Sequence, residues 1–511
     1  MIAWTIYLCF LGALVLSLLP GSSPRFTRAL ALITSLASLL VGLVSAISYS
    51  PAGGVATVAR HPWVPSLGIE YYLAVDGISI VMVLLTGIAS VAGILFSWNI
   101  EHRIKEFFSF YLVLIGAVYG VFLSFDLFLF FVFYELAIVP KYFLIAIWGS
   151  TNREYGAMKL ALYSFIGSAM ILVVLLAAFV VSGAKTFDLA QMAKFPFPLS
   201  FQMWALPVMF VGFAILAGLW PFHTWAPTGH VAAPTAASML LAGVVMKLGA
   251  YGALRVAMTL FPLGLDNWGH KVLGFESWRD LFAVLALIGI VYGALVALVQ
   301  KDFKFVIGYS SVSHMGFVLL GLMTLTQIGL SGAVLQMFSH GIVAGLLFAV
   351  VGRMVYERSH TRDLSELEKM RLFKIIPFAA FTFVIGGLAS MGLPGFSGFV
   401  AELQILIGAW RAFPTYAVLA GIGIIVGVAY TIRTIARAFF SGEGDASQVT
   451  DSGASEHAGA MVPISIPERV GAGLLMALTL AIGLFPRLLL DFIHPALASP
   501  LFANLLKGFG P

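Results

Sequence analysis

The sequence predicts an all-α integral membrane protein with about fourteen transmembrane helices. Of its 511 residues, 60% are hydrophobic and only 10% are charged, and the mean hydropathy is +1.01. A water-soluble fold of this size would need more polar surface. Apolar stretches of about 20 residues, the length that crosses a bilayer, recur along nearly the whole chain, as at residues 29–48, 78–98 and 160–181. We therefore expect the lipid bilayer to surround the protein.

The first apolar stretch, residues 2–19, is predicted to be a transmembrane helix rather than a cleaved signal peptide. No basic residue precedes it and no small-residue cleavage site follows it. Cys9, inside this stretch, is the only cysteine. A single cysteine excludes an intrachain disulfide, a cysteine-ligated iron–sulfur cluster and a cysteine zinc site. We expect neither a metal site nor an electron centre of that kind on this chain.

The basic residues predict the orientation in the membrane. The net charge is +5, but the basic residues fall in short loops between spans, so we expect no nucleic acid partner. One set occupies alternate loops, at residues 25–28, 103–105, 153, 301–304 and 353–374. These loops should face the cytoplasm, with both termini on the opposite side. Four basic residues in the other loops weaken this bias: Lys185, Lys194, Lys271 and Arg279.

Two apolar segments are interrupted by proline and glycine. They are residues 218–234, GLWPFHTWAPTGHVAAP, and residues 390–398, SMGLPGFSG. Proline removes a backbone donor, so a helix must open there. In lipid an open helix is tolerated only where protein or a water-filled cavity satisfies the backbone, and one break in each half suggests an internal repeat. The alternative is ordinary turns between helices. Residues 183–200, 263–279 and the long polar stretch 441–458 are predicted to be loops.

Four ionisable side chains lie inside apolar stretches: Glu135, Lys247, His340 and Glu402. A charged group at mid-membrane costs at least about 2.5 kcal/mol, so each needs a partner, water or a function. Lys247 is roughly central in its stretch, and a low-dielectric surrounding lets a lysine give and take a proton near neutral pH. We expect Lys247 to be a proton-relay station. The alternative is a side chain that reaches the membrane surface.

The two carboxylates and a nearby lysine extend this hypothesis. Glu135 and Glu402 are expected to change protonation as a cation approaches or leaves, and the alternative is a structural carboxylate. Lys141 follows Glu135 by six residues, so on a regular helix it points about 120° away and ~9 Å along the axis. A direct pair would need a kink at Pro140. Lys141 is also close enough to its span's end to reach the membrane surface instead.

Four histidines are further candidates. His223 and His230 flank the first break, and His314 and His340 lie in successive predicted spans. A single histidine is more often hydrogen-bonded structure than a relay. Histidines on adjacent spans are also compatible with bis-histidine haem ligation. Haem would leave Lys247, Glu135 and Glu402 unexplained, so we expect no cofactor on this chain.

Five strings carry a family resemblance that covers residues 72–440. They are LAVDGIS (73–79), PFHTWAPTGHVAAPT (221–235), QKDFKFVIGYSSVSHMGF (300–317), QMFSHGIVAGLLF (336–348) and GLPGFSGFVAE (392–402). Together they resemble the antiporter-like subunits that respiratory complex I shares with Mrp-type cation/proton antiporters. Glu402, where related branches commonly have lysine, and the YEL motif at Glu135 are similar to the M-type branch.

This resemblance implies two inverted five-helix repeats with discontinuous helices. The implied organisation is N-terminal helices at 1–106, repeats at 107–262 and 279–440, and a polar loop with a C-terminal helix at 441–511. It also implies a multi-pass protein of a bacterial inner membrane. The implied partners are other complex I membrane subunits, especially the N-type and L-type neighbours. NADH, FMN, iron–sulfur clusters and quinone are expected on partner subunits, because this chain has no redox or nucleotide motif.

The resemblance also implies roles for individual residues. Glu135 would be the carboxylate on the side where protons enter, Lys247 the central lysine, and Glu402 the carboxylate on the far side. His314 and His340 would form the linking chain. The family's usual lysine about seven residues before His223 falls near Leu216 and is missing. We hypothesise that Lys141 supplies this cation. The alternatives are an antiporter or membrane-bound hydrogenase subunit, which could include sodium, and a structural spacer that does not pump.

Overall fold

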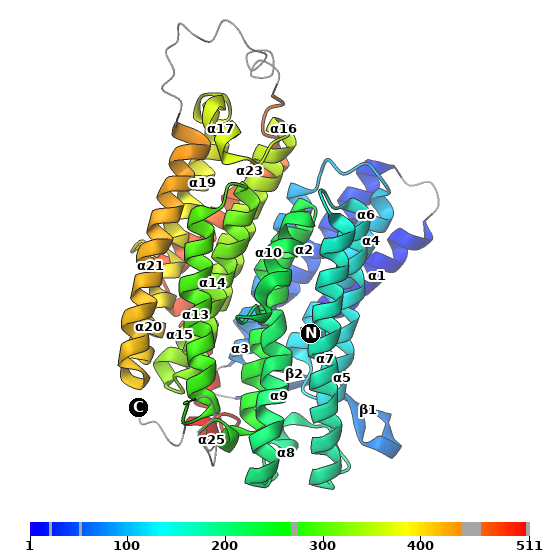
Figure 1. The fold of residues 1–511 in the computed structure, drawn as a ribbon. Helices are drawn as coiled ribbons and strands as arrows, with labels where there is room; N and C mark the ends of the chain where they lie inside the picture. Colours follow the sequence, from blue (N-terminus) through cyan, green and yellow to red (C-terminus); the bar gives the residue numbers. More distant parts are fainter. Residues whose placement is uncertain (20–22, 51–53, 267–273, 442–460, 507–511) are drawn as a thin grey trace, which may run out of the picture.

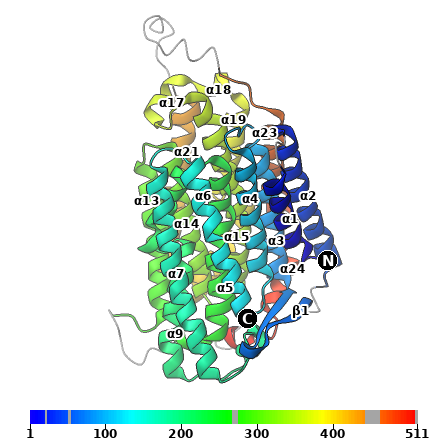
Figure 2. The same cartoon turned by 90° about the vertical axis from the view of Figure 1, so that its right-hand side faces the viewer.

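A computed structural model describes residues 1–19, 23–50, 54–266, 274–441 and 461–506. Long helices lie side by side along a common direction, and two short strands extend from one end of the bundle (Figures 1 and 2). Among the described residues, 12 helices are long and apolar enough to cross a membrane, which confirms the predicted multi-pass fold. Two shorter apolar helices, Trp4–Leu18 and Pro377–Ser390, accompany them. The total of about fourteen spans stays a prediction.

The N-terminal part contains four long helices and a hairpin that the sequence did not lead us to expect. Its elements are α1 (Trp4–Leu18), α2 (Pro24–Ser48), β1 (Ala56–Val64), β2 (Ile69–Val75), α3 (Gly77–Phe96) and α4 (Ile104–Leu123). The strands pair antiparallel. Gly68 at their turn has φ +66, and a Cβ there would meet the carbonyl of Lys185 at 1.9 Å. Only glycine fits this turn against the neighbouring loop.

The next part contains the first predicted break. Its elements are α5 (Leu127–Leu136), α6 (Ile138–Trp148), α7 (Arg153–Ser182), α8 (Leu189–Met192), α9 (Leu199–Ala217), a 3₁₀ turn (Phe222–Thr224), α10 (Trp225–Ala232), α11 (Thr235–Leu240) and α12 (Met246–Gly252). π-helical segments precede and follow α12, at Leu241–Val245 and Ala253–Met258. The helix therefore opens between Ala217 and Trp225 and again at Ala233, so the first predicted break is confirmed.

The remaining part contains the second predicted break. Its elements are α13 (Trp278–Val299), α14 (Phe303–Met323), α15 (Gln327–Ala349), a π-helical segment (Val350–Tyr356), α16 (Glu357–Ser359), α17 (Leu364–Met370), α18 (Leu372–Ile375), α19 (Pro377–Ser390), α20 (Ser397–Ala412), α21 (Pro414–Ile435), a second π-helical segment (Ala436–Phe440), α23 (Ile466–Leu484), α24 (Arg487–Leu497) and α25 (Ala503–Leu506). The interruption between α19 and α20 confirms the break predicted at residues 390–398.

The basic loops gather at one end of the bundle. Arg28 donates to the carbonyl of Ile100 at 3.1 Å, and Arg362 donates to the Ser150 hydroxyl at 3.4 Å. Lys304 was predicted to lie in a loop, and this is wrong. It lies in the first turn of α14, with only 4% of its surface exposed. Arg279, likewise predicted in a loop, lies in the first turn of α13 and is buried. The predicted loop at 441–458 lies outside the described residues beyond Ser441.

The same backbone arrangement occurs at both ends of the bundle. Asp126 forms an isolated antiparallel bridge with Asp188, and Asp302 forms one with Asp363. All four aspartates accept backbone N–H groups at the start of a helix. Each bridge is flanked by the same pair of backbone hydrogen bonds, one residue before and one after the aspartates. The first bridge lies near the β-hairpin and the second near α17, at opposite ends (Figure 2).

Candidate functional site

Lys247 lies on α12 in the centre of the bundle and is fully buried. Its ammonium group is 2.8 Å from Nδ1 of His340 on α15, and it donates to the carbonyl of Ala242. The π-helical turn before α12 makes the second contact possible, because the Met246 N–H bonds to Leu241, five residues back, instead of Ala242. The alternative that Lys247 reaches the membrane surface is wrong.

His314 on α14 contacts Glu402 on α20. Its Nδ1 atom lies 3.2 Å from the Glu402 carboxylate, and its Nε2 atom lies 3.1 Å from the hydroxyl of Ser390. All three side chains are buried. Ser390 ends α19 and Glu402 lies in α20. The second helix break therefore holds the carboxylate and a hydroxyl on either side of one histidine.

The imidazoles of His340 and His314 connect these two contacts. Their ring centroids are 5.3 Å apart, with an angle of 33° between the planes. Lys247, His340, His314 and Glu402 thus form a continuous buried polar chain from the first half of the sequence to its second break. Three of the four imidazole nitrogens face Lys247, Glu402 or Ser390.

Gln336 also belongs to this chain, and sequence analysis missed it. Its amide nitrogen lies 3.3 Å from the Glu402 carboxylate and 3.4 Å from Nδ1 of His314. The side chains surround a cavity of about 10 Å³, roughly one water in size. The available signal was spacing, since Gln336 precedes His340 by one helical turn and so lies on the same face.

Glu135 and Lys141 form a second cluster. Pro140 lacks an N–H, and the helix is interrupted at Ala137 between α5 and α6. Lys141 is only 1% exposed, so the alternative that it reaches the membrane surface is wrong. Lys141 is the charged group that acts on half-buried Glu135, and Ser168 on α7 lies close to the Glu135 carboxyl group. The ammonium of Lys141 has no hydrogen-bond partner among the described residues.

Leu216 occupies the position where a lysine was expected. It is buried near the end of α9, and its backbone would lie 3.1 Å from a Cβ on Gly249, two residues after Lys247. Aromatic rings fill the junction of α5 with α9, where Tyr134 and Phe213 have centroids 5.8 Å apart. Lys247 donates to Ala242 and contacts His340, and no hydrogen bond joins it to Glu135 among the described residues.

His223 and His230, at the first break, are both buried. Their ring nitrogens form no hydrogen bonds with the described residues. The charges that act on His230 are Lys247 and Lys304, whereas the charge that acts on His223 is Lys159. His230 is therefore near the polar chain, and His223 packs instead against the ring of Tyr292, 5.2 Å away.

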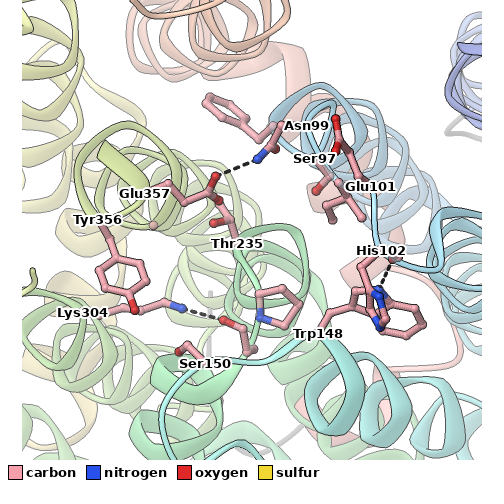
Figure 3. A pocket seen from close by; sticks show the side chains of 15 residues that line it. Ser97, Asn99, Glu101, His102, Trp148, Ser150, Thr235, Lys304, Tyr356 and Glu357 are labelled. Atoms are coloured by element: carbon pink, nitrogen blue, oxygen red, sulfur yellow. Dashed lines mark hydrogen bonds between the residues drawn. The ribbon is translucent and has the colours of Figure 1, made fainter. Parts of the chain in front are cut away.

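A pocket of about 270 Å³ opens at the end where the basic loops gather (Figure 3). Its wall includes Glu101 and His102 from the loop before α4, Lys304, and Glu357 at the start of α16. Ala233 and Pro234, between α10 and α11, and Thr235, the first residue of α11, also line it. The pocket thus reaches from the surface to the residues that immediately follow His230 and its helix.

Comparison with known proteins identifies the family. Residues 124–427 match the family described as NADH:quinone oxidoreductase/Mrp antiporter, TM. The chain is 36% identical to NADH-quinone oxidoreductase subunit M of Rhodobacter capsulatus over 495 residues, which cover 94% of this chain and 91% of the relative.

Two solved structures resemble the fold along nearly its whole length. A chain of respiratory complex I from Thermus thermophilus with bound NADH matches with a TM-score of 0.86 and 28% identity, over 99% of this chain and 100% of that chain. A chain of the Mrp complex from Dietzia sp. DQ12-45-1b matches with a TM-score of 0.79 over 99% and 98%, but at 22% identity this likeness shows the fold alone. This protein belongs to the NADH:quinone oxidoreductase/Mrp antiporter membrane family and, within it, to the M-type antiporter-like subunits of complex I.

Proposed function

We propose that this chain moves protons across the membrane as a subunit of a complex I-type NADH-quinone oxidoreductase. The observation that supports this function most strongly is the buried chain from Lys247 through His340 and His314 to Glu402. Each of these side chains can gain and lose a proton, and consecutive groups are close enough for transfer directly or through one water. His230, on which the charge of Lys247 acts, is a further titratable group, and residues 233–235, which follow its helix, line the pocket in Figure 3.

Coulomb interaction between the two clusters provides the coupling. Two unit charges about 8 Å apart interact by about 2 kcal/mol at an effective dielectric constant of about 20. A positive charge that moves towards Lys247 destabilises the ammonium, so the proton passes to His340 and on towards Glu402. A positive charge beside Glu135 stabilises its carboxylate. Displacement of the Lys141 ammonium between these positions would therefore link the two protonation states.

The energy for this transfer comes from other subunits. Moving one charge against 100 mV costs about 2.3 kcal/mol. In the proposed complex, partner subunits carry NADH, FMN, iron–sulfur clusters and quinone, and the neighbours in the membrane are N-type and L-type subunits. We further propose that the complex is in a bacterial inner membrane, with the basic-loop end of the bundle in the cytoplasm.

We also propose that residues 107–262 and 279–440 are inverted repeats, with 1–106 and 441–511 as flanking segments. The two aspartate bridges at opposite ends of the bundle support this division, because Asp126 with Asp188 lies in one repeat and Asp302 with Asp363 in the other. A two-fold axis in the membrane plane would relate such arrangements. Each proposed repeat contains one of the two helix breaks.

One observation favours a second function, that of a structural spacer. Leu216, whose backbone lies close to Gly249 on α12, is apolar at the position where the family resemblance implies a lysine. If no other cation replaces that lysine, Glu135 and Lys247 are uncoupled and this subunit does not pump. Lys141 is the residue that decides between the two functions.

Proton pumping by the intact complex in proteoliposomes distinguishes them. Wild type, Lys247→Ala and Lys141→Ala are compared at matched assembly and matched electron flux. We expect both variants to lower pumping per electron. Loss in Lys247→Ala alone would leave Lys141 without a role, and wild-type pumping in both would make the spacer the leading function. Replacing sodium in the buffer by potassium tests the antiporter alternative, in which sodium is transported.

A further inference from the structure

The carboxyl end of α10 is held by an unusual set of donors. The last four carbonyl groups of a helix have no partner within it. Here the Gly229 carbonyl accepts from the Ala233 N–H at 2.9 Å, and the His230 carbonyl accepts from the Ser238 hydroxyl at 2.7 Å. The Ala232 carbonyl accepts from the Ser150 N–H at 2.8 Å. The helix in which His230 lies is therefore fixed at its end by groups from two other elements.

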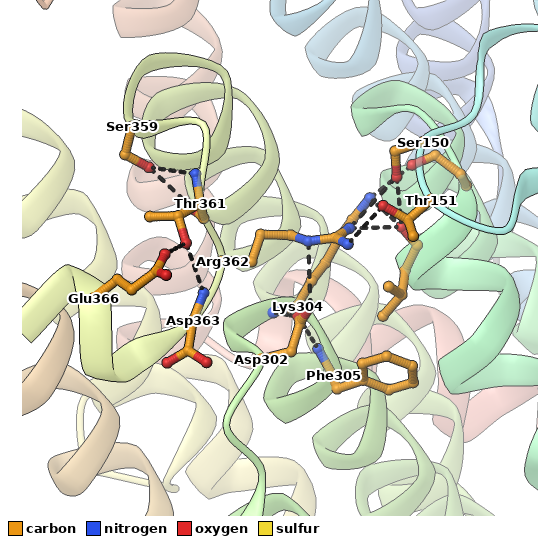
Figure 4. Close-up of polar contacts among 12 residues, drawn as sticks. Ser150, Thr151, Asp302, Lys304, Phe305, Ser359, Thr361, Arg362, Asp363 and Glu366 are labelled. Carbon is orange, nitrogen blue, oxygen red and sulfur yellow. Dashed lines mark hydrogen bonds and ion pairs between the residues drawn. The ribbon is translucent and has the colours of Figure 1, made fainter.

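The fourth carbonyl, that of Val231, is held by cations from the other half of the chain. Lys304 and Arg362 each donate to it at 3.2 Å, and the Ser150 hydroxyl also donates at 3.2 Å. Lys304 donates in addition to the Ala233 carbonyl at 2.6 Å. Figure 4 shows the side chains of Lys304 and Arg362 extending towards Ser150 and Thr151. A helix's carboxyl end carries partial negative charge, which two adjacent cations stabilise.

Local contacts fix both cations in place. The Asp302 carboxylate caps α14 by accepting a hydrogen bond from the backbone N–H of Lys304 at 2.8 Å. The same carboxylate pairs with Nε of Arg362 at 3.2 Å. Phe303 and Arg362 are joined by a backbone hydrogen bond of 2.8 Å in the second aspartate bridge. The bridge between Asp302 and Asp363 thus positions both cations against the first helix break.

We propose that Lys304 is a positioning residue for proton transfer, which holds the carboxyl end of α10 and so fixes the position of His230, a titratable side chain on that helix. This inference rests on the proposed function. In this role Lys304 holds the helix end through hydrogen bonds from its ammonium group and does not carry the transported proton. Its ammonium is occupied by two carbonyl oxygens, and these contacts are part of the wall between the pocket of Figure 3 and α10. Because Lys304 lies on α14, a movement of α14 is transmitted through this side chain to α10 and changes the geometry around His230.

A lysine-to-arginine comparison separates a fixed cation from a proton carrier. Arginine keeps the charge and several donors but does not lose its proton in proteins. Lys304→Arg, Lys304→Met, Lys247→Arg and Lys247→Met are assayed for pumping per electron in the intact complex at matched assembly. We expect Lys304→Met to lower pumping by about threefold or more, and Lys304→Arg to restore most of it. At Lys247, both substitutions should abolish pumping by this subunit.

Lys301→Met is the matched control, because Lys301 has the same charge in the same segment but is exposed. Wild-type pumping in Lys304→Met would overturn the proposal, as would equal loss in Lys304→Arg and Lys304→Met, which would make Lys304 a proton carrier. Wild-type pumping in Lys247→Met would instead contradict the proposed function itself. If Lys304→Met does not assemble, Arg362→Gln removes the other cation from Val231, and wild-type pumping in that variant would also overturn the proposal.

Discussion

The ammonium group of Lys247 and Nδ1 of His340 lie 2.8 Å apart, although 93 residues separate them in the sequence. This contact joins α12 of the first half to α15 of the second, and both side chains are buried. In the proposed route, this is the step at which the proton leaves the lysine, and its 2.8 Å separation is shorter than the 3.2 Å between His314 and Glu402.

Replacing His340 tests this step directly. In His340→Ala, Lys247 loses its proton acceptor, and the gap to His314 becomes longer than a hydrogen bond. We expect pumping per electron to fall by about tenfold or more, the range of a lost acid–base group. The control is His61→Gln, because His61 lies exposed on β1. Pumping at the wild-type ratio in His340→Ala would show that protons bypass this histidine.

Restoring a lysine at position 216 tests whether Lys141 replaces the lysine that the family usually has there. Lys141→Met removes the charge that acts on Glu135, and we expect pumping to fall by roughly thirtyfold, given an interaction of about 2 kcal/mol. Adding Leu216→Lys to this variant should restore part of the pumping, because residue 216 is beside α12. Assembly is measured in both variants by the yield of intact complex. The relocation hypothesis fails if Lys141→Met pumps normally.

Asp76 and Arg255 form a buried ion pair that should govern stability. Their side chains are each 1% exposed, with Nη1 of Arg255 2.6 Å from the carboxylate, which also caps α3 through the Ser79 N–H at 2.9 Å. Arg255→Leu leaves a buried charge without its partner, which costs about 3–5 kcal/mol. The thermal midpoint of the assembled complex should fall clearly.

A double variant and a surface control complete this test. Asp76→Asn together with Arg255→Leu should cost less than the two single changes added together. Glu106→Gln breaks an exposed pair with Arg103, whose side chains are 46% and 48% exposed, and should cost about 0–1 kcal/mol. Equal midpoints for Arg255→Leu and Glu106→Gln would contradict the assigned role of the buried pair.

Close backbone approach between α7 and α9 predicts a strict requirement for glycine. A Cβ at Gly167 would lie 2.5 Å from the carbonyl oxygen of Gly212. Backbone atoms cannot move aside as a flexible side chain can, so Gly167→Ala should destabilise the fold by about 1–3 kcal/mol. Gly421 on α21 has no neighbour within 4 Å of an added Cβ, and Gly421→Ala should leave the unfolding midpoint unchanged or slightly raised. Similar midpoints for both variants would refute this packing.

Much of the organisation was predictable from the sequence because the bilayer restricts the possible structures. Long apolar stretches must be helices in lipid, and proline inside such a stretch must open the helix. Both predicted breaks are present. The β-hairpin was missed because it lies outside the apolar stretches, where the membrane imposes no such constraint. The predicted loop position of Lys304 was wrong. The distribution of basic residues predicts which loops face the cytoplasm, but it does not predict whether a basic side chain near a loop points into the bundle.

Single residues of the polar chain were predictable by type, since each ionisable group within an apolar stretch needs a compensating partner. Which partner each one has was decided by the tertiary structure. Helix packing places His340 against Lys247 and His314 against Glu402, and it adds Gln336, an uncharged residue without a burial penalty large enough to mark it in the sequence. The sequence by itself determined that buried charges exist, because their cost depends on residue type and local hydropathy. Only the tertiary structure decided how they connect, because hydrogen bonds require distances of about 3 Å between helices that are remote along the chain.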